Sequence, residues 1–331
     1  MRVAVVYNEP VKGTPDSEDV RDEVDLVISS LQDLGHDYKL FPVESYNGRY
    51  SIFESVFFFL VALKEYLPDV VFNLVEGTME DAIYQTYFPL IFQSDNYPFT
   101  GSDHEALLAT TDKSLSKWIM GNSHIQTPPY DVYRGGQLLL TVPGPWIVKP
   151  AAEDASIGIG DASVFKSESR LLSALPGMYE QLRMQPLIIE QYIDGREFNV
   201  SLLETGDGGV EVLPVAEIIF NAWPAGKPRI VGYDAKWKPE SFECKNTIRK
   251  FNPDDAPLSL LMETALKCWK VFRLRGYARV DIRLGTDGKV YVLEANANPC
   301  ISPDSGFIAS LREAGYPDSY FINTVLDVSM R

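Results

Sequence analysis

Cysteine and histidine are scarce in this chain of 331 residues, which contains three of each. Cys244, Cys268 and Cys300 are far apart and show neither metal-ligand nor C-x-x-C spacing, so a zinc cluster or a redox motif is not indicated. The histidines are equally scattered along the sequence. A reduced, cytoplasmic protein is the simplest interpretation.

Positively charged residues are also few: the chain has 30 Lys and Arg against 46 Asp and Glu, which gives a net charge of −16. A nucleic-acid surface requires a clustered basic footprint, so no nucleic-acid partner is expected. The most apolar run, 56–63, is far shorter than the roughly 20 residues of a membrane span, which predicts a buried helix and no membrane. The apolar run at the amino terminus is too short for a signal peptide.

What is present is enough apolar sequence, 45% of the residues, to fill sizeable cores. In the first hundred residues, apolar runs of strand length alternate with segments whose apolar residues recur at helical spacing. Such β-α-β-α-β alternation predicts a parallel sheet covered on both faces. The expected strands are 2–7, 38–43 and 69–75, and the expected helices are 20–34, stopped by Gly35, and 52–67.

The rest of the chain predicts a different arrangement, with helices in 101–135 and at the carboxyl terminus and an antiparallel sheet between them. Three lobes are expected, at 1–100, 101–185 and 186–331, which gives an α/β fold with α+β lobes. The remaining strands are expected at 146–150, 187–193, 197–203, 210–219, 279–284 and 289–296, with a helix at 258–274 and a long ordered loop at 221–242.

The last two of these strands flank Gly-Thr-Asp-Gly, a strong hairpin signal. If Asp287 and Gly288 form a two-residue turn, Asp281 lies opposite Glu294 and Arg279 lies opposite Asn296. Directly opposed Cβ atoms are roughly 4.5–5.5 Å apart and share a face of the sheet, so two carboxylates and an amide would converge beside an arginine.

Two carboxylates at that separation repel each other unless a cation intervenes or one of them is protonated. Hard oxygen ligands of this kind suit Mg²⁺, which completes its coordination shell with water and phosphate. The alternative for this hairpin is a solvated pair of strands with both acids facing water. A three-residue turn would remove the predicted convergence.

Together with five further segments, this hairpin resembles the D-alanine–D-alanine ligase family of ATP-grasp enzymes. The segments occur in the family's order from residue 8 to residue 306 and cover nearly the whole chain. They are the substrate segment 73–81, Asp112-Lys113, the phosphate-covering loop 149–158 (Lys149 to Gly158), the nucleotide hinge 190–197, the loop motif 233–237, and Arg279 with Asp281, Glu294 and Asn296.

The resemblance implies an ATP-grasp fold, in which an amino-terminal parallel lobe supports two lobes that clasp ATP. It implies a carboxylate–amine ligase that uses ATP with Mg²⁺, or Mn²⁺ in its place. The first substrate's carboxylate attacks the γ-phosphoryl group to give an acyl phosphate, and the second substrate's amine then displaces phosphate. No protein nucleophile is required. The expected partners are small carboxylate and amine substrates, and the resemblance suggests a homodimer through the amino-terminal lobe.

The family's functional positions map onto this sequence residue by residue. For the nucleotide, the implied residues are Lys113 and Lys149 on the phosphates, Glu190, Gln191, Tyr192 and Ile193 on adenine, and Glu197 on the ribose. For metal they are Asp281, Glu294 and Asn296. For catalysis they are Arg279 on the oxyanion, Ser156 in the phosphate loop, Lys236 on the mobile loop and Glu9 on the first substrate's ammonium. For the substrates they are Glu76, Trp237, Cys300 and Ser305, the last of them on the second substrate's carboxylate.

Several positions on the amino-acid side depart from the family pattern. Ala155 and Trp237 replace a serine and a tyrosine that share a hydrogen-bonded triad. Glu76 and Asp304 replace histidines, and Cys300 replaces a glycine. Because the nucleotide-side positions match, the pattern predicts retained chemistry with altered substrates, and Glu76 and Asp304 favour a cationic or amine-bearing group.

Three functions therefore remain open. The leading prediction is a ligase that forms a dipeptide or related amide, including D-alanyl-D-alanine itself. The second is a ligase of specialised metabolism with a substrate other than D-alanine. The third, of another class, is a regulatory protein that binds nucleotide without turnover, and the presence of Arg279 speaks against it because a binder has little need of an oxyanion-stabilising arginine.

Overall fold

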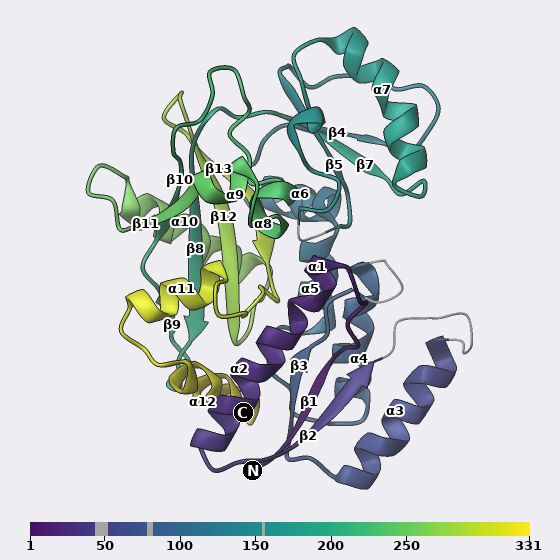
Figure 1. Ribbon diagram of the computed structural model, residues 1–331, viewed down its shortest axis with the longest axis vertical. Helices are drawn as coiled ribbons and strands as arrows, with labels where there is room; N and C mark the ends of the chain where they lie inside the picture. Colours follow the sequence, from purple (N-terminus) through teal and green to yellow (C-terminus); the bar gives the residue numbers. More distant parts are fainter. Residues whose placement is uncertain (44–51, 78–81, 154–155) are drawn as a thin grey trace.

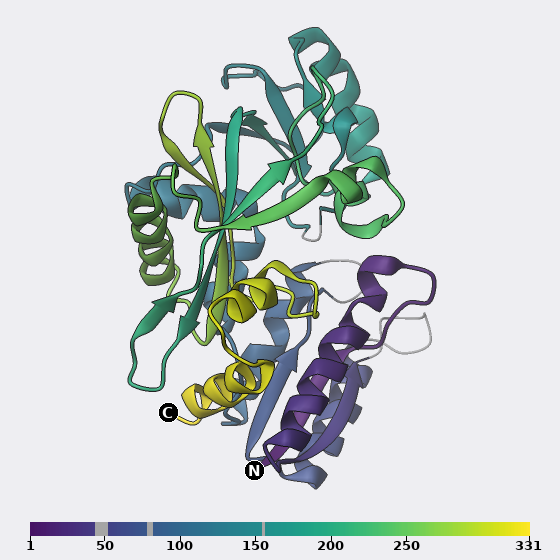
Figure 2. The same ribbon diagram turned by 60° about the vertical axis from the view of Figure 1, so that its left-hand side comes forward.

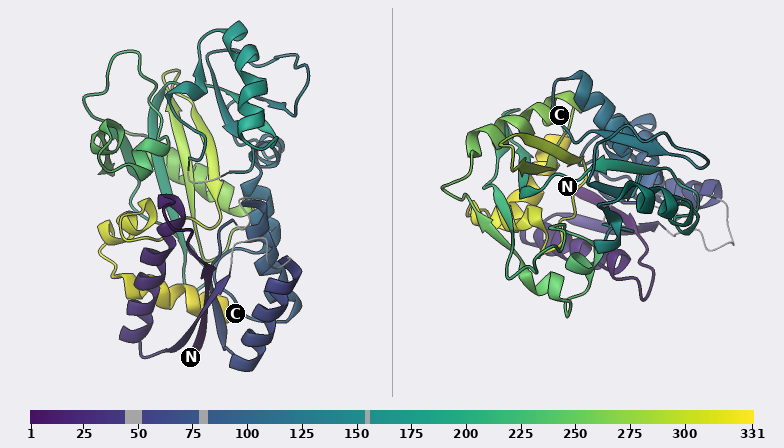
Figure 3. Two further views of the ribbon diagram at one scale, coloured as in Figure 1. Left: turned by 45° about the vertical axis from the view of Figure 1, so that its right-hand side comes forward. Right: turned by 90° about the horizontal axis from the view of Figure 1, so that it is seen from above.

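The computed structural model describes residues 1–43, 52–77, 82–153 and 156–331. Its three β-sheets are stacked along the long axis of the molecule, with the amino-terminal sheet at one end and the smallest lobe at the other (Figures 1 and 3). Residues 78–81 of the predicted substrate segment and residues 154–155 of the predicted phosphate loop are not in those ranges. Glu80, Asp81 and Ala155 therefore lie outside the described residues.

The amino-terminal sheet is parallel, as predicted, with β1 in the centre and the strand order β2-β1-β3. Alternate residues of β1 point to opposite faces: Val3 and Val5 pack against α2, whereas Ala4 and Val6 pack against α3 and α4. Helix α2 ends where Gly35 adopts a positive φ of 70°. The elements of this region are β1 (Arg2–Asn8), α1 (Pro15–Glu18), α2 (Val20–Asp33), β2 (Asp37–Val43), α3 (Ile52–Tyr66), β3 (Val70–Leu74), η1 (Ala82–Thr86) and α4 (Tyr87–Ser94).

The smallest lobe contains a four-stranded antiparallel sheet in the order β4-β7-β5-β6, and one helix, α7, covers it (Figure 1). Apolar side chains from one face of β5 and β7 meet Leu171 and Leu175 of α7. The elements are β4 (Tyr130–Tyr133), β5 (Trp146–Pro150), η2 (Asp161–Ser163), β6 (Val164–Phe165), α7 (Glu168–Gln181) and β7 (Leu187–Gln191).

The largest sheet is antiparallel, as predicted, in the order β11-β10-β8-β12-β13, with β9 paired to β8. The two faces of this sheet differ in character because side chains alternate along each strand. The even-numbered residues 198–202 of β8 and 278–282 of β12 are apolar and pack on α5, α6 and α10, while odd-numbered residues such as Glu197, Asp281 and Arg283 lie on the opposite face. The elements are α5 (His104–Thr111), α6 (Lys113–Asn122), β8 (Gly195–Glu204), β9 (Val210–Val212), β10 (Ala216–Phe220), β11 (Thr247–Phe251), α10 (Leu258–Val271), β12 (Tyr277–Gly285) and β13 (Val290–Asn296).

Two segments differ from the sequence-based expectation. The expected single strand 210–219 is divided into β9 and β10. The Leu213 amide still donates to the Ser201 carbonyl at 3.0 Å, but Pro214, which has no N–H to donate, follows it between the two strands. The expected ordered loop 221–242 carries a short helix, α8 (Tyr233–Trp237), and a second, α9 (Phe242–Asn246), begins at its end. Ser241 caps α9 by accepting a hydrogen bond from the Cys244 amide at 2.9 Å.

The hairpin of β12 and β13 has the predicted residue pairing, but its turn differs from the predicted one. Its turn is not the two-residue turn expected, because the Gly285 amide bonds to the Lys289 carbonyl and encloses three residues, with Gly288 at a positive φ of 78°. A β-bulge at Leu293 then restores the register, so Arg279 faces Asn296 and Asp281 faces Glu294. The extra residue in the turn and the extra residue in the bulge compensate for each other.

The hydrophobic cores cross the predicted lobe boundaries. The carboxyl-terminal helices α11 (Gly306–Glu313) and α12 (Asp318–Ser329) share a core with β1, β3 and α2, so the end of the chain lies beside its beginning (Figures 1 and 2). Helices α5 and α6 belong to the core of the largest sheet. The division at residues 100 and 185 stays a prediction. No helix among the described residues combines the length and the hydropathy needed to cross a bilayer.

Candidate active site

A cavity of about 1070 Å³ lies among the three sheets, above the polar face of the largest one. It is lined from all three lobes, which fits the sequence prediction that distant motifs converge on one site. The predicted residues that line it are Glu76, Lys113, Lys149, Ser156, Glu190, Gln191, Tyr192, Ile193, Glu197, Lys236, Trp237, Arg279, Asp281, Glu294, Asn296, Cys300 and Ser305.

The floor of the cavity is built by the hairpin. Arg279 and Asp281 are two residues apart on β12 and form a two-point ion pair, with Nε to Oδ1 at 2.8 Å and Nη2 to Oδ2 at 2.9 Å. Asn199 on β8 donates to the same Oδ1 at 2.7 Å. On β13 the amide of Asn296 lies 3.4 Å from Oε1 of Glu294. The predicted convergence of two carboxylates and an amide beside an arginine is therefore present.

The charges around Glu294 indicate a site for a polyanion. Burial opposes ionisation of this carboxyl, but Lys113, Lys236, Lys149 and Arg279 together hold its pKa far below the usual range. These four cations come from α6, α8, β5 and β12, four elements distant in sequence. Arg279 is also paired with Asp281, and Lys149 with Glu190, but all four cations converge on Glu294, an arrangement that suits a triphosphate.

The donor set also fits a divalent cation. Asp281, Glu294 and Asn296 present carboxylate and amide oxygens, the hard ligands that Mg²⁺ prefers, and Mg²⁺ needs only a few of them because phosphate and water complete its shell. Burial raises the pKa of Asp281, and the Arg279 charge opposes this rise. Within the described ranges no group of three or more His, Cys, Asp and Glu side chains could enclose a metal by itself.

At the end of the cavity predicted to bind nucleotide, Glu190 is buried between two lysines. Its carboxylate pairs with Lys117 at 3.2 Å and Lys149 at 3.1 Å. Burial raises the pKa of Glu190, but the two ammonium groups outweigh it and lower the pKa overall. Desolvation in turn lowers the pKa of Lys117 to about 8. Lys117 was not predicted, although its position one helical turn after Lys113 places both on one side of α6.

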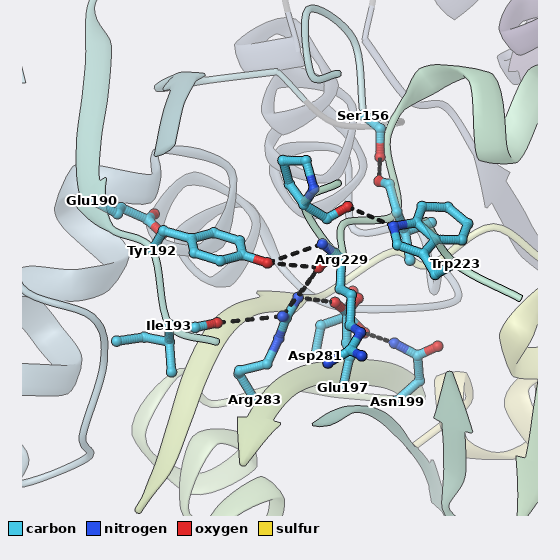
Figure 4. Close-up of polar contacts among 12 residues, drawn as sticks. Ser156, Glu190, Tyr192, Ile193, Glu197, Asn199, Trp223, Arg229, Asp281 and Arg283 are labelled. Carbon is cyan, nitrogen blue, oxygen red and sulfur yellow. Dashed lines mark hydrogen bonds and ion pairs between the residues drawn. The ribbon is translucent and has the colours of Figure 1, made fainter. Parts of the chain in front are cut away.

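The loop between β10 and α8 lines the cavity with Ile230 and Val231, and Figure 4 shows its polar contacts with Tyr192 and Arg283. The hydroxyl of Tyr192 accepts from the Arg229 amide at 2.9 Å, and Nη1 of Arg283 donates to the carbonyls of Ile193 and Arg229 at 3.3 and 3.1 Å. Arg283 also forms an ion pair with Glu197, the residue predicted to bind ribose. These contacts connect the predicted adenine segment to the loop through Arg283, which was not predicted.

The same loop contacts the other two lobes. Ser156 donates its hydroxyl to the Val231 carbonyl at 2.8 Å, and the Tyr233 amide donates to the Ile159 carbonyl at 2.9 Å. The Tyr233 hydroxyl reaches the amino-terminal lobe and donates to Asp16 at 2.8 Å. The segment 156–159 and the loop therefore form a continuous cover over the predicted phosphate region.

The end of the cavity predicted to bind substrate is acidic and is built around Cys300. The thiol donates to Asp19 at 3.0 Å. Burial, with the charges of Glu23, Asp19 and Glu76, raises the pKa of this thiol well above its normal value, which favours the neutral thiol that donates to Asp19. Behind it, the buried Glu23 accepts from the Ile301 amide at 2.6 Å and fixes the chain that follows Cys300.

Glu9 is the one predicted site residue that is not brought to this cavity. Its side chain is exposed, and Glu9 is absent from the described residues that line the cavity. Asp19, at the start of α2, lines the cavity and accepts from the Cys300 thiol. A pair of acids four residues apart at a predicted helix start, Asp19 and Glu23, is a signal in the sequence that could have identified them.

Comparisons with known proteins agree with this geometry. The family described as D-ala D-ala ligase C-terminus matches residues 137–327. The D-alanine–D-alanine ligase of Thermotoga petrophila is 30% identical over 91% of this chain and 89% of its own length. An uncharacterized protein of Sinorhizobium fredii, y4sG, is 30% identical over 100% of this chain and 97% of its own. The D-alanine–D-alanine ligase from Bacillus anthracis, solved in complex with ATP, has a TM-score of 0.73 at 21% identity, over 100% of this chain and 98% of that one.

The fold is thus that of the ATP-grasp enzymes, with a cavity enclosed by three lobes. More specifically, the chain belongs to the D-alanine–D-alanine ligase family, a family of ATP-dependent ligases. The predictions of fold class and family are confirmed.

Proposed function

We propose that this protein binds ATP with Mg²⁺ and uses it to join a carboxylate to an amine through an acyl phosphate. The observation that carries the proposal is the meeting of Lys113, Lys149, Lys236 and Arg279 around Glu294, beside Asp281 and Asn296. A site with four cations and three oxygen-bearing side chains suits a metal-bound triphosphate better than it suits any neutral ligand.

In the first step an oxygen of the carboxylate substrate bonds to the γ-phosphorus, and the bond to the β-phosphate oxygen breaks, giving ADP. Lys113 and Lys149 bind the phosphate oxygens and align the phosphoryl group. Asp281, Glu294 and Asn296 would hold the divalent cation, which would neutralise charge on the phosphates.

In the second step the amine nitrogen bonds to the acyl carbon, phosphate leaves, and a proton passes from the nitrogen to the departing phosphate. The tetrahedral intermediate carries an oxyanion, which Arg279 stabilises with a backbone N–H near Cys300. Asp281 holds the Arg279 guanidinium in place through its two-point pair. The cover formed by residues 156–159 and 229–233 excludes water, which would otherwise hydrolyse the acyl phosphate.

We infer that the substrates include a cationic or amine-bearing group in addition to the reacting ones. Asp19, Glu76 and Asp304 all line the cavity around Cys300 and give its substrate end negative charge. This favours an amide-forming ligase with a substrate other than D-alanine over the synthesis of D-alanyl-D-alanine. The predicted cytoplasmic location suits an enzyme that consumes ATP.

The test is a screen of D- and L-amino acids, diamines and simple carboxylates in pairs, with ATP and Mg²⁺, in which ADP release and product mass are measured together. The expected product is an amide formed in equal amount to ADP. Strong turnover with D-alanine alone would show the classical dipeptide reaction instead. Nucleotide binding with no ADP release from any pair would refute the ligase and favour the regulatory alternative.

A further inference from the structure

Arg283 is a buried arginine on the polar face of the largest sheet. It lies on β12 two residues after Asp281, so the two side chains point to the same face, and it lines the cavity. Only 3% of its surface is exposed. A guanidinium withdrawn from water to this degree is costly unless hydrogen bonds and an opposite charge compensate for it. Neither the sequence motifs nor the proposed chemistry assigns this arginine a role.

The guanidinium of Arg283 contacts three separate segments around the cavity (Figure 4). Nη2 forms an ion pair with Glu197 of β8. Nη1 and Nη2 both donate to the Arg229 carbonyl in the loop between β10 and α8, at 3.1 and 3.0 Å, and Nη1 also donates to the Ile193 carbonyl at 3.3 Å. Arg283 therefore joins the predicted ribose residue, the predicted adenine segment and the cover of the cavity.

Glu197 is held by this contact through only one of its two oxygens. Arg283 and Glu197 are directly paired across β12 and β8, so their side chains lie on the same face. Oε2 of Glu197 accepts from Nη2 of Arg283, whereas Oε1 accepts no hydrogen bond from any residue in the described part of the chain. A carboxylate with one oxygen fixed by an arginine presents the other in a defined direction, which suits a hydroxyl donor of a ligand.

The cover of the cavity depends on the same guanidinium. Both polar groups of the Arg229 main chain are fixed, because its N–H donates to the Tyr192 hydroxyl at 2.9 Å and its carbonyl accepts from Arg283. Two residues later, the Val231 carbonyl accepts from the Ser156 hydroxyl at 2.8 Å. One side chain thus contributes both to the position of the cover and to the orientation of the predicted ribose residue.

We propose that Arg283 is a positioning residue, which orients Glu197 toward a ribose hydroxyl of the bound nucleotide and joins that contact to the closed position of the cover. This inference rests on the proposed ATP-dependent function. Because one guanidinium makes both contacts, its loss should weaken the selection of ribose over deoxyribose and should also admit water to the acyl phosphate.

The first experiment compares ATP with 2′-deoxy-ATP and 3′-deoxy-ATP as substrates of the wild type and of Arg283→Met, whose side chain is unbranched and has no donor. The wild type is expected to prefer ATP in kcat/KM over at least one of the two analogues. This preference should fall about ten-fold in Arg283→Met, as loss of one oriented hydrogen bond to a charged group predicts. The ratio of phosphate to amide should rise several-fold in the same variant.

A double-mutant cycle tests whether Arg283 acts through Glu197. Glu197→Gln keeps an oxygen for the ribose but cannot form the ion pair. If Arg283 orients the carboxylate, Arg283→Met should cause no further loss of ribose preference in the Glu197→Gln background. Equal losses in both backgrounds, or an Arg283→Met variant that prefers ATP as strongly as the wild type, would overturn the proposal.

Arg283→Lys and Arg312→Met are the matched variants. Arg283→Lys keeps a cation beside Glu197 without the planar fork, so it should retain part of the ribose preference with a raised ratio of phosphate to amide. It carries the comparison if Arg283→Met does not fold, and wild-type values of both quantities would contradict the proposal. Arg312 makes the same kinds of contact outside the cavity, since it pairs with Asp318 and donates to the Pro303 carbonyl at 2.7 Å. Arg312→Met should therefore keep the wild-type ribose preference.

A binding measurement separates this inference from the ligase function. Calorimetric titration with ADP, 2′-deoxy-ADP and 3′-deoxy-ADP in the presence of Mg²⁺ requires no turnover. A preference for ADP in the wild type that falls in Arg283→Met supports the positioning role even if no pair of substrates yields an amide. Equal affinity of the wild type for the three nucleotides counts against that role even if the ligase is active.

Discussion

The hydroxyl of Tyr233 donates to Oδ1 of Asp16 at 2.8 Å, which joins the loop over the cavity to the amino-terminal lobe. The family's triad has a serine and a tyrosine at positions that are Ala155 and Trp237 here. Tyr233 is one helical turn before Trp237 on α8, so it reaches across the cavity from nearly the same side of that short helix.

Replacing Tyr233 by Phe should loosen this closure. Loss of one hydrogen bond of about 1 kcal/mol predicts roughly a five-fold rise in phosphate released without amide formed, because water enters and hydrolyses the acyl phosphate. The ratio of phosphate to amide measures the effect. Asp16→Asn is the control and should keep the wild-type ratio, since its amide oxygen still accepts from the Tyr233 hydroxyl. Equal ratios of phosphate to amide in Tyr233→Phe and the wild type would refute the role of this contact.

Replacing Arg279 by Lys should reduce kcat by about a hundred- to a thousand-fold, because an ammonium cannot keep the two-point pair with Asp281 while it stabilises an oxyanion. Acyl-phosphate formation should be affected less than amide formation. Single-turnover kinetics that resolve the two steps provide the measurement. A variant in which both steps slow equally would place Arg279 on the phosphates alone.

Replacing Glu76 by Gln should weaken binding of the cationic substrate by about ten-fold and leave KM for ATP unchanged, since the carboxylate contributes its charge at the Cys300 end. Steady-state KM values for both substrates and ATP test this. Glu9→Gln serves as the control because Glu9 is exposed outside the cavity. A normal substrate profile in Glu76→Gln, or a defect in Glu9→Gln, would contradict the site described above.

Burial raises the pKa of Glu23 to about 7, which makes the stability of the fold depend on pH. A carboxyl whose pKa is higher in the folded state than in the unfolded chain stabilises the fold when protonated. That stability is fully present below pH 4.5 and is lost as the pH rises through 7. At pH 8 the free energy of unfolding of Glu23→Gln should therefore exceed that of the wild type by on the order of 3 kcal/mol. This difference should shrink as the pH falls toward 4.5.

Urea unfolding at several pH values measures this difference, and the variant keeps an oxygen to accept from the Ile301 amide. Glu313→Gln, an exposed change on α11, should alter stability little at any pH. A gap between Glu23→Gln and the wild type that does not vary with pH would show that the pKa of Glu23 is the same in the folded and unfolded states.

The sequence by itself determined the elements and the faces on which their side chains lie. Alternation along 279–284 and 289–296 assigned Arg279, Asp281, Glu294 and Asn296 to one face, because the side-chain period of a strand is two and does not depend on the rest of the molecule. The amino-terminal β-α-β pattern predicted its parallel sheet for the same local reason.

Only the tertiary structure decided which distant groups meet. The compensation between the three-residue turn and the bulge at Leu293, the pairing of Lys117 with Glu190, and the contact of Asp19 with Cys300 all depend on contacts between separate elements. Burial and charge are properties of the assembled site, since four cations lower the pKa of Glu294 only after folding brings four separate elements together. A sequence pattern predicts the face of a strand on which each side chain lies, but it does not predict which side chains of separate elements come into contact.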